Sequence, residues 1–237
     1  MAYFKYRIAE LNVELNLYGE RVKRQAEPYI FEFDGKADIV IDIKKEFIEQ
    51  YHERHRELSF DDCEYIIIGY YFYKAVLDFD GFLIHSSAVV YENRAYLFTA
   101  PSGTGKSTHT ALWLKNLKGS YILNDDKPLI RIIDGEVLAF GTPFSGKNDI
   151  NVNIGVPLAA VTYITRGNEN CIFKVNMPQA INILLWQTVR TKNKDVAEKT
   201  LNMIDRILRR IPVYEMSCDM SQSAFTASYE KLTGKKF

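Results

Sequence analysis

The sequence has little cysteine, no excess of either charge and no long hydrophobic run. Only three of its 237 residues are cysteine, Cys63, Cys171 and Cys218, and none of them belongs to a CxxC pair. An odd number of scattered cysteines argues against a disulfide scaffold and against a thiolate zinc site. We therefore expect three free thiols in a reducing compartment, which predicts a cytoplasmic protein.

The charge balance and hydrophobic pattern exclude two further classes of partner. Lys+Arg and Asp+Glu number 30 each, so the formal net charge is 0 and gives no long-range attraction for nucleic acid or anionic lipid. The most hydrophobic run, residues 65–73, ends at Lys74 and is too short to cross a bilayer. The first residues, MAYFKYRIAELNVEL, lack the charged start and apolar core of a signal peptide. We expect neither nucleic acid nor a membrane as a partner.

The first 80 residues read as an N-terminal α/β accessory segment. The alternation in "FKYRIAELNVEL", "YIFEF" and "ADIVIDI" predicts short strands, and the charged run at residues 44–58 is expected to be solvated. Residues 61–81 predict a helix that Asp61 caps, with Glu64 completing a capping box and Gly81 ending it. We interpret the aromatic stripe of this helix as core packing.

Residues 81–237 alternate strands and helices, which predicts an α/β fold with a mixed sheet. Expected strands are 83–91, 95–99, 121–123, 128–140 (a hairpin with Asp134-Gly135 as a type I′ turn), 156–165 and 213–218. Expected helices are 106–117, 178–189, 195–211 and one near 222–232. We interpret this part as one catalytic core.

The stretch "APSGTGKST" matches a phosphate-binding loop between an apolar strand and an amphipathic helix, with Ala100 in place of the loop's first glycine. Glycines let the backbone N–H groups turn inward as an anion nest, and the lysine and serine reach the β/γ-phosphates and Mg²⁺. The alternative is a Gly/Ser turn that only caps a helix. The predicted phosphate-binding residues are Ser102, Gly103, Thr104, Gly105, Lys106, Ser107 and Thr108.

A tight hairpin precedes this loop, and its register places a histidine beside it. If Glu92 and Asn93 form a two-residue turn, His85 lies opposite Ala100, whereas a three-residue turn places it opposite Pro101. Either register brings the imidazole to the base of the loop, where it could act in proton transfer. The alternative is a half-buried histidine that ends a strand.

Asp125 and Asp126 follow the strand at residues 121–123, which should run parallel to the strand before the loop. Parallel strands end at the same sheet edge, so both carboxylates should lie beside Lys106 and Ser107. One would hold Mg²⁺ and the other would accept a proton from an attacking hydroxyl. The alternative is a solvated turn before Pro128.

Together these features resemble the C-terminal catalytic domain of the HPr kinase/phosphorylase family and, more distantly, the nucleotide site of phosphoenolpyruvate carboxykinases. The shared pattern is a strand that starts at histidine, a hairpin, "SGTGKS", a helix and an Asp-Asp pair. The stretch "GTPFSGKNDINVNIGVPLAAV" is similar to a shorter branch that shares GTP(F/W)SGK. The resemblance covers residues 85–153, does not extend to residues 1–80, and implies a P-loop kinase core.

The resemblance also implies roles for single residues. Lys106 and Ser107 would bind phosphate and metal, Asp125 would be the catalytic base, and Asp126 would be the carboxylate on the metal side. His85 would assist at the hydroxyl or the phosphate. ATP and Mg²⁺ are the implied cofactors, and because members of the family assemble, a homo-oligomer is compatible with the resemblance.

The sequence thus predicts a kinase that transfers the γ-phosphoryl group of ATP to a hydroxyl of serine type on a peptide, a protein or a small molecule. Lys147, between Gly146 and Asn148, would help Lys106 to balance the γ-phosphate charge; the alternative is a solvated lysine. A second hypothesis is a nucleotide-binding switch or assembly factor with no acceptor. A third is a carboxykinase-like carbon–carbon enzyme. Neither the acceptor nor the choice between ATP and GTP can be determined from these residues.

Overall fold

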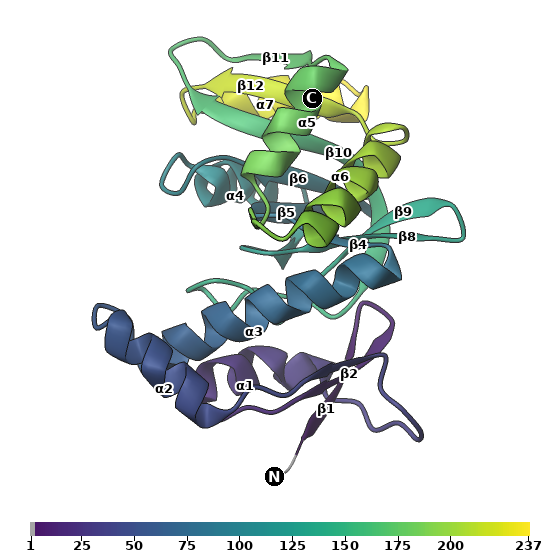
Figure 1. The fold of residues 1–237 in the computed structure, drawn as a ribbon. Coiled ribbons are helices and arrows are strands. Elements are labelled where there is room, and N and C mark those ends of the chain that lie inside the picture. Colours follow the sequence, from purple (N-terminus) through teal and green to yellow (C-terminus); the bar gives the residue numbers. More distant parts are fainter. Residues whose placement is uncertain (1–2) are drawn as a thin grey trace.

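The computed structural model describes residues 3–237 and has two sheets (Figure 1). The first sheet consists of three N-terminal strands, in the order β1 (Phe4–Ile8), β2 (Leu11–Leu15) and β3 (Ile39–Ile41). The helical elements of this part are α1 (Glu20–Ala26), the 3-10 helix η1 (Glu27–Tyr29), α2 (Lys45–Arg54), α3 (Phe60–Val76) and the 3-10 helix η2 (Leu77–Phe79). The long helix α3 crosses the middle of the molecule, between this sheet and the second one (Figure 1).

The second sheet is mixed and, within residues 3–237, has nine strands. Its main path runs in the order β4 (Gly81–Leu83), β8 (Leu129–Ile133), β9 (Glu136–Phe140), β10 (Gly155–Arg166), β6 (Arg94–Thr99), β5 (Ser86–Tyr91) and β7 (Tyr121–Asn124). Beside β10 lie β12 (Val213–Cys218) and then β11 (Cys171–Lys174). Its helices are α4 (Lys106–Asn116), α5 (Met177–Trp186), α6 (Lys194–Leu208) and α7 (Gln222–Thr233).

Side chains of the central strand β6 alternate between the two faces of this sheet. Ala95 and Leu97 join a core that also contains residues of α5 and α6, whereas Tyr96 and Phe98 join a core with residues of α4 and α7. This is the period of two that a strand buried on both faces requires. The sheet is therefore covered by helices on both faces.

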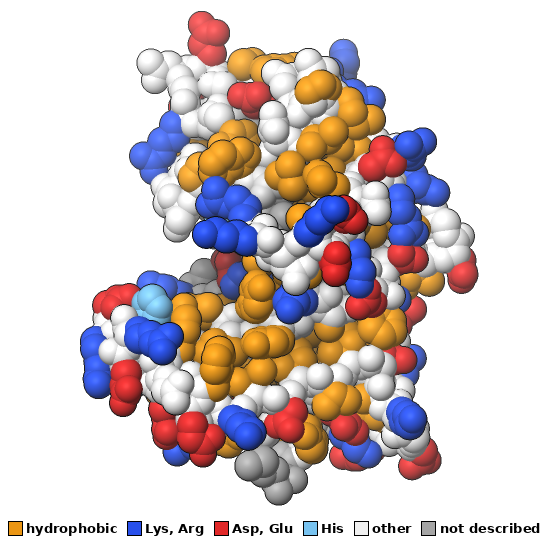
Figure 2. All heavy atoms as spheres, in the orientation of Figure 1, with side chains coloured by type: hydrophobic (Ala, Val, Ile, Leu, Met, Phe, Trp, Pro, Cys, Tyr) orange, Lys and Arg blue, Asp and Glu red, His pale blue; other side chains and the backbone are white. Residues whose placement is uncertain are grey.

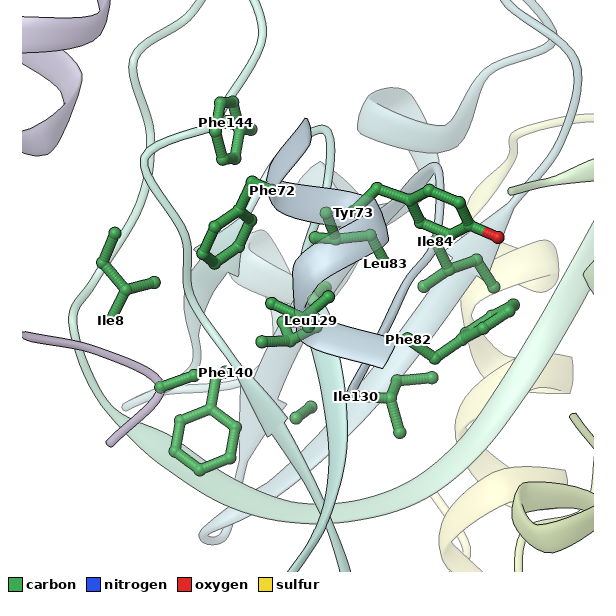
Figure 3. Packing of buried hydrophobic residues seen from close by; sticks show 14 of the residues in the cluster. Ile8, Phe72, Tyr73, Phe82, Leu83, Ile84, Leu129, Ile130, Phe140 and Phe144 are labelled. Carbon is green, nitrogen blue, oxygen red and sulfur yellow. The ribbon is translucent and has the colours of Figure 1, made fainter. Parts of the chain in front are cut away.

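One continuous hydrophobic core joins the N-terminal segment to the second sheet. It contains Tyr6, Ile8 and Val22 from the N-terminal part, Phe72 of α3, and Phe82 of β4. Figure 3 shows Ile8, Phe72 and Phe82 among the packed side chains of this cluster. The first 80 residues therefore share their hydrophobic core with the rest of the chain. The domain boundary between residues 80 and 81 stays a prediction.

The strand expected in the segment "YIFEF" is absent, and the segment forms only a single bridge, Tyr6 to Ile30. The charged run at residues 44–58 is solvated as expected, with only Ile48 buried, and it contains helix α2, which the sequence pattern did not predict. The sequence analysis also missed α1 and, later in the chain, β11. The helices α1 and α2 are rich in charged residues, and β11 is short and exposed. Such segments have no strong hydrophobic period, so the sequence pattern does not predict them.

The cap of α3 also differs from the expectation. Ser59 is the N-cap residue and Asp62 completes the capping box, while Glu64 instead accepts backbone N–H bonds from Tyr18 and Gly19. Gly81 does not end the helix but begins β4. The helix start shifted because serine two positions earlier offers a hydroxyl to the same first turn.

The expected elements of the second part are largely confirmed. The hairpin β8–β9 has Asp134 and Gly135 at its turn, with φ of 50° and 85° as a type I′ turn requires. The strand expected at 83–91 is divided: β4 and β5 pair with different strands, and Ile84 and His85 lie between them. Because of the break between β4 and β5, His85 does not occupy a regular strand position.

All three cysteines are free, with Cys63 and Cys218 buried.

The surface is hollowed between α3 and the elements drawn above it (Figure 2). Within residues 3–237, every helix is too short or too polar to cross a membrane.

Candidate functional site

The predicted phosphate loop, residues 100–105, connects β6 to α4 and has the backbone that its glycines predict. Gly103 and Gly105 adopt φ of 76° and 120°, which side-chain-bearing residues rarely tolerate. A Cβ on Gly105 would also lie 2.6 Å from the Cε of Met220. No side chain caps the N-terminus of α4 at Gly105, so the N–H groups of its first turn are available to an anion.

Lys106 and Arg166 organise the loop from two sides. Lys106 is a buried residue, and its ammonium donates to the carbonyl oxygen of Ala100 at 3.0 Å. Burial lowers the pKa of Lys106, and the charges of Asp126 and Asp125 oppose that shift. Arg166, at the end of β10, donates to the carbonyl oxygens of Gly103 (2.6 Å) and Thr104 (3.3 Å). The sequence analysis did not single out Arg166, because only the pairing of β10 with β6 brings it to the loop.

The hairpin before the loop has the two-residue turn. Glu92 and Asn93 have φ of 48° and 56°, and the ladder runs from Tyr91↔Arg94 to Ser86↔Thr99. This register confirms the two-residue turn, and the ladder ends one residue before His85, whose carbonyl oxygen accepts from the Thr99 hydroxyl at 2.7 Å. The backbone N–H of His85 donates to the backbone carbonyl oxygen of Gln187 at 2.7 Å, so a segment distant in the sequence holds the His85 backbone in place.

The His85 ring is half-buried beside Asp126. Its Nε2 lies 3.4 Å from Oδ1 of Asp126, and its Nδ1 has no hydrogen-bond partner among the described residues. Burial is the largest cause that lowers the pKa of His85; the Lys106 charge adds to it and the Asp126 charge opposes it. At neutral pH the imidazole is therefore uncharged and able to accept a proton.

The two aspartates meet different partners. The Ser107 hydroxyl donates to Asp125, 3.1 Å from Oδ1, and the Asn148 amide donates to its Oδ2 at 2.9 Å. Asp126 Oδ2 instead accepts from the Tyr65 hydroxyl at 2.8 Å and lies 3.2 Å from Lys127 Nζ. The strand that carries them, β7, runs parallel to β6 as expected, but β5 lies between the two.

The N-terminal segment supplies one wall of this site. Tyr65 of α3 binds Asp126 and also accepts from the Gly146 N–H at 3.2 Å. Burial, then the Asp126 charge, raises the pKa of Tyr65, so the hydroxyl remains a donor. Arg21 of α1 lies 3.9 Å from the centre of the Tyr65 ring and donates to the carbonyl oxygen of Gly146 at 2.7 Å. The aromatic residues of α3 were interpreted as core packing, so the role of the Tyr65 hydroxyl at this site was not predicted. Arg21 belongs to no sequence motif and was not predicted either.

These groups surround one cavity of about 480 Å³. It is lined by the phosphate loop without Thr104, by both aspartates, and by His85, Arg21 and Lys147. Lys147 is exposed there and has no partner among the described residues. Within residues 3–237 no group of three or more His, Cys, Asp or Glu side chains is arranged to hold a metal alone. A metal here would need oxygens of a ligand and water, the coordination that Mg²⁺ prefers.

Comparisons with known proteins add a distant likeness only. Scanning family models and searching curated proteins gave no match. Among solved structures, the HPr(Ser) kinase/phosphatase from Coxiella burnetii is similar, at 13% identity and a TM-score of 0.30. The match covers 54% of this chain and 92% of that chain. This is a distant similarity of a mixed α/β fold, so the function is inferred from the site residues themselves.

Proposed function

We propose that this protein is a kinase that transfers the γ-phosphoryl group of ATP to a hydroxyl. The observation that carries the proposal is the pair of His85 and Asp126 next to the buried Lys106 of a phosphate loop. The lysine would neutralise the β/γ-phosphate oxygens, and the uncharged imidazole beside it would take the acceptor's proton. A protein that only binds nucleotide has no need of such a pair.

Ser107 and Asp125 are the residues that would hold Mg²⁺. A phosphate-loop serine and an aspartate at the end of a nearby strand are the usual protein ligands of this ion in P-loop enzymes, and here the two side chains are in hydrogen-bond contact. Bound there, Mg²⁺ would neutralise charge on the phosphates. The family resemblance implies the opposite roles, with Asp126 on the metal side; the contacts of Ser107 favour Asp125, and we adopt that assignment.

His85 and Asp126 would then handle the proton. Nε2 of His85 faces Asp126, so Nδ1 would accept the proton as the acceptor oxygen forms its bond to the γ-phosphorus. The bond from that phosphorus to the β,γ-bridging oxygen breaks, and its electron pair leaves with ADP. Asp126 stabilises the imidazolium, and Lys106, with the exposed Lys147, balances the phosphoryl charge.

The test is acceptor-dependent ADP formation from labelled ATP in the presence of Mg²⁺. A kinase forms one phosphoester per ADP, and ADP formation slows strongly when the acceptor is omitted. Free serine, alcohols, serine-containing peptides and HPr-like proteins are suitable acceptors. Release of ADP and inorganic phosphate at one rate with and without every acceptor would contradict the proposal and favour the nucleotide-binding switch.

The pH dependence of kcat/KM should report the protonation state of the His85 imidazole. Because burial and Lys106 lower its pKa from the ordinary value of about 6.5, the imidazole is uncharged at neutral pH and becomes protonated only in more acidic solution. We expect kcat/KM to be constant near pH 7 and to fall on an acidic limb with its midpoint below 6.5. In His85→Gln that limb should disappear together with most of the activity. An identical limb in the variant would assign it to another group.

A further inference from the structure

A second cavity of about 480 Å³ meets the nucleotide cavity at the catalytic pair. Both cavities are lined by His85 and Asp126, and no residue of the phosphate loop lines the second one. Its walls come from α3, from the end of β4, and from residues 186–189 after α5. A ligand in this second cavity would therefore lie beyond the phosphate loop, with one end at the proton-accepting pair.

The walls of this second cavity are mostly apolar, and the uncharged polar side chains of Tyr70, Gln187 and Thr188 also line it. Leu83, Ile84 and Tyr73 are buried in them, and Figure 3 shows the three side chains close together. The Tyr73 hydroxyl is bonded to Thr200 and so is not free for a ligand. Ile66 and Trp186 line the same cavity with 40% and 65% of their surface exposed, which makes them its solvent-facing part.

Charged side chains occur in this cavity only at the end shared with the nucleotide site. They are Asp126 and Lys127, beside the uncharged His85, and the Lys127 ammonium lies 3.2 Å from Asp126 and 4.5 Å from the centre of the Tyr65 ring. Lys127 is thus already paired. A ligand with its own charged groups along its body would lose water there and gain no partner, which is unfavourable.

From these walls we infer that the phosphoryl acceptor is a small alcohol with an apolar body, aromatic or branched aliphatic, and a terminal hydroxyl. The inference rests on the proposed kinase function and names its substrate class. The hydroxyl would lie at His85 Nδ1 and the body would lie against Tyr73, Ile84 and Trp186. Free serine, a zwitterion, would be a poor acceptor, and the nucleoside of ATP would lie outside this cavity.

Binding can be tested without phosphoryl transfer because the chain has two tryptophans. Trp113 is fully buried and its indole N–H donates to Ser228, whereas Trp186 lines the cavity. In ¹⁵N-labelled protein, 2-phenylethanol should shift the Trp186 indole signal and leave that of Trp113 in place. Glycerol at equal concentration should shift neither. A shift of Trp186 by ATP alone would mean that the cavity holds the nucleoside, and would overturn the inference.

Kinetics test the same cavity as an acceptor site. We expect kcat/KM for 2-phenylethanol to exceed that for glycerol or free serine by about tenfold or more, the scale on which an apolar pocket discriminates. Trp186→Ala should raise the KM for 2-phenylethanol severalfold with little change in the KM for ATP, and Trp186→Phe should restore it. Phe47→Ala, on α2 outside the cavity and 48% exposed, is the matched control and should change neither constant.

The outcomes separate this inference from the function on which it rests. Transfer to glycerol or serine with equal or higher kcat/KM, and an unmoved Trp186 signal, would leave the kinase standing and overturn the apolar acceptor. In a third outcome, no compound and no peptide is phosphorylated, while 2-phenylethanol still shifts the Trp186 signal. The second cavity would then bind an apolar ligand but the protein would not be a kinase, which overturns both the proposed function and the acceptor inference.

Discussion

Replacing Asp126 with asparagine should lower kcat for phosphoryl transfer by about 10²–10⁴-fold, the contribution typical of a general acid–base group. The amide can still accept from the Tyr65 hydroxyl, so the local packing is retained. It carries no charge, however, and cannot stabilise a protonated His85 3.4 Å away. Single-turnover kinetics at saturating Mg²⁺ would measure the loss, and nucleotide affinity should stay close to that of the wild type.

Asp125→Asn is the matched comparison, since the two aspartates are neighbours with the same chemistry. Asp125 contacts Ser107 and Asn148, so its loss should mainly raise the Mg²⁺ concentration needed for half-maximal rate. In the opposite pattern, Asp126→Asn changes the Mg²⁺ dependence and Asp125→Asn lowers kcat at saturating Mg²⁺. That result would restore the assignment that the family resemblance implies.

Phe144→Ala should lower the free energy of unfolding by about 3–5 kcal/mol, the usual cost of removing a buried aromatic ring. Phe144 has no exposed surface and packs against Phe72 and Tyr65, with ring centres 5.4 and 5.7 Å away. It belongs to the "GTPFSGK" stretch, so the same ring fixes the loop that carries Gly146 and Asn148. Urea unfolding would give the stability, and the KM for ATP should rise as well.

Phe173→Ala is the control for that measurement. Phe173 lies on β11 with 47% of its surface exposed, and we expect its removal to change stability by less than about 0.5 kcal/mol. Equal losses in the two variants would show that Phe144 has no special part in joining the loop to α3.

The parts of the site that could be predicted are those set by neighbours in the chain. The φ values of Gly103 and Gly105 follow from residue type, and the two-residue turn at Glu92 and Asn93 determines the hairpin register up to Ser86 opposite Thr99, next to His85. The capping of α3 was mispredicted at the same short range, because Ser59 and Asp61 are both good caps, and in the folded chain the Asp61 carboxylate accepts from the Glu20 N–H instead.

The partners of the two aspartates and the shape of the second cavity could not be predicted in this way. Tyr65 and Asp126 are 61 positions apart in the chain, and Arg21 and Gly146 are 125 apart. Contacts of this kind depend on how α1 and α3 pack against the second sheet, and no local pattern carries that information.

By itself, the sequence determined a glycine-containing loop between a strand and a helix, a two-residue hairpin that brings a histidine near this loop, and two carboxylates at the end of the strand two places away. Short-range backbone geometry and strand direction are sufficient for each of these features. Only the tertiary structure decided which carboxylate meets Ser107 and which meets His85, and that an apolar cavity opens beyond them. Those features depend on side chains from distant segments that meet only once the common core has formed.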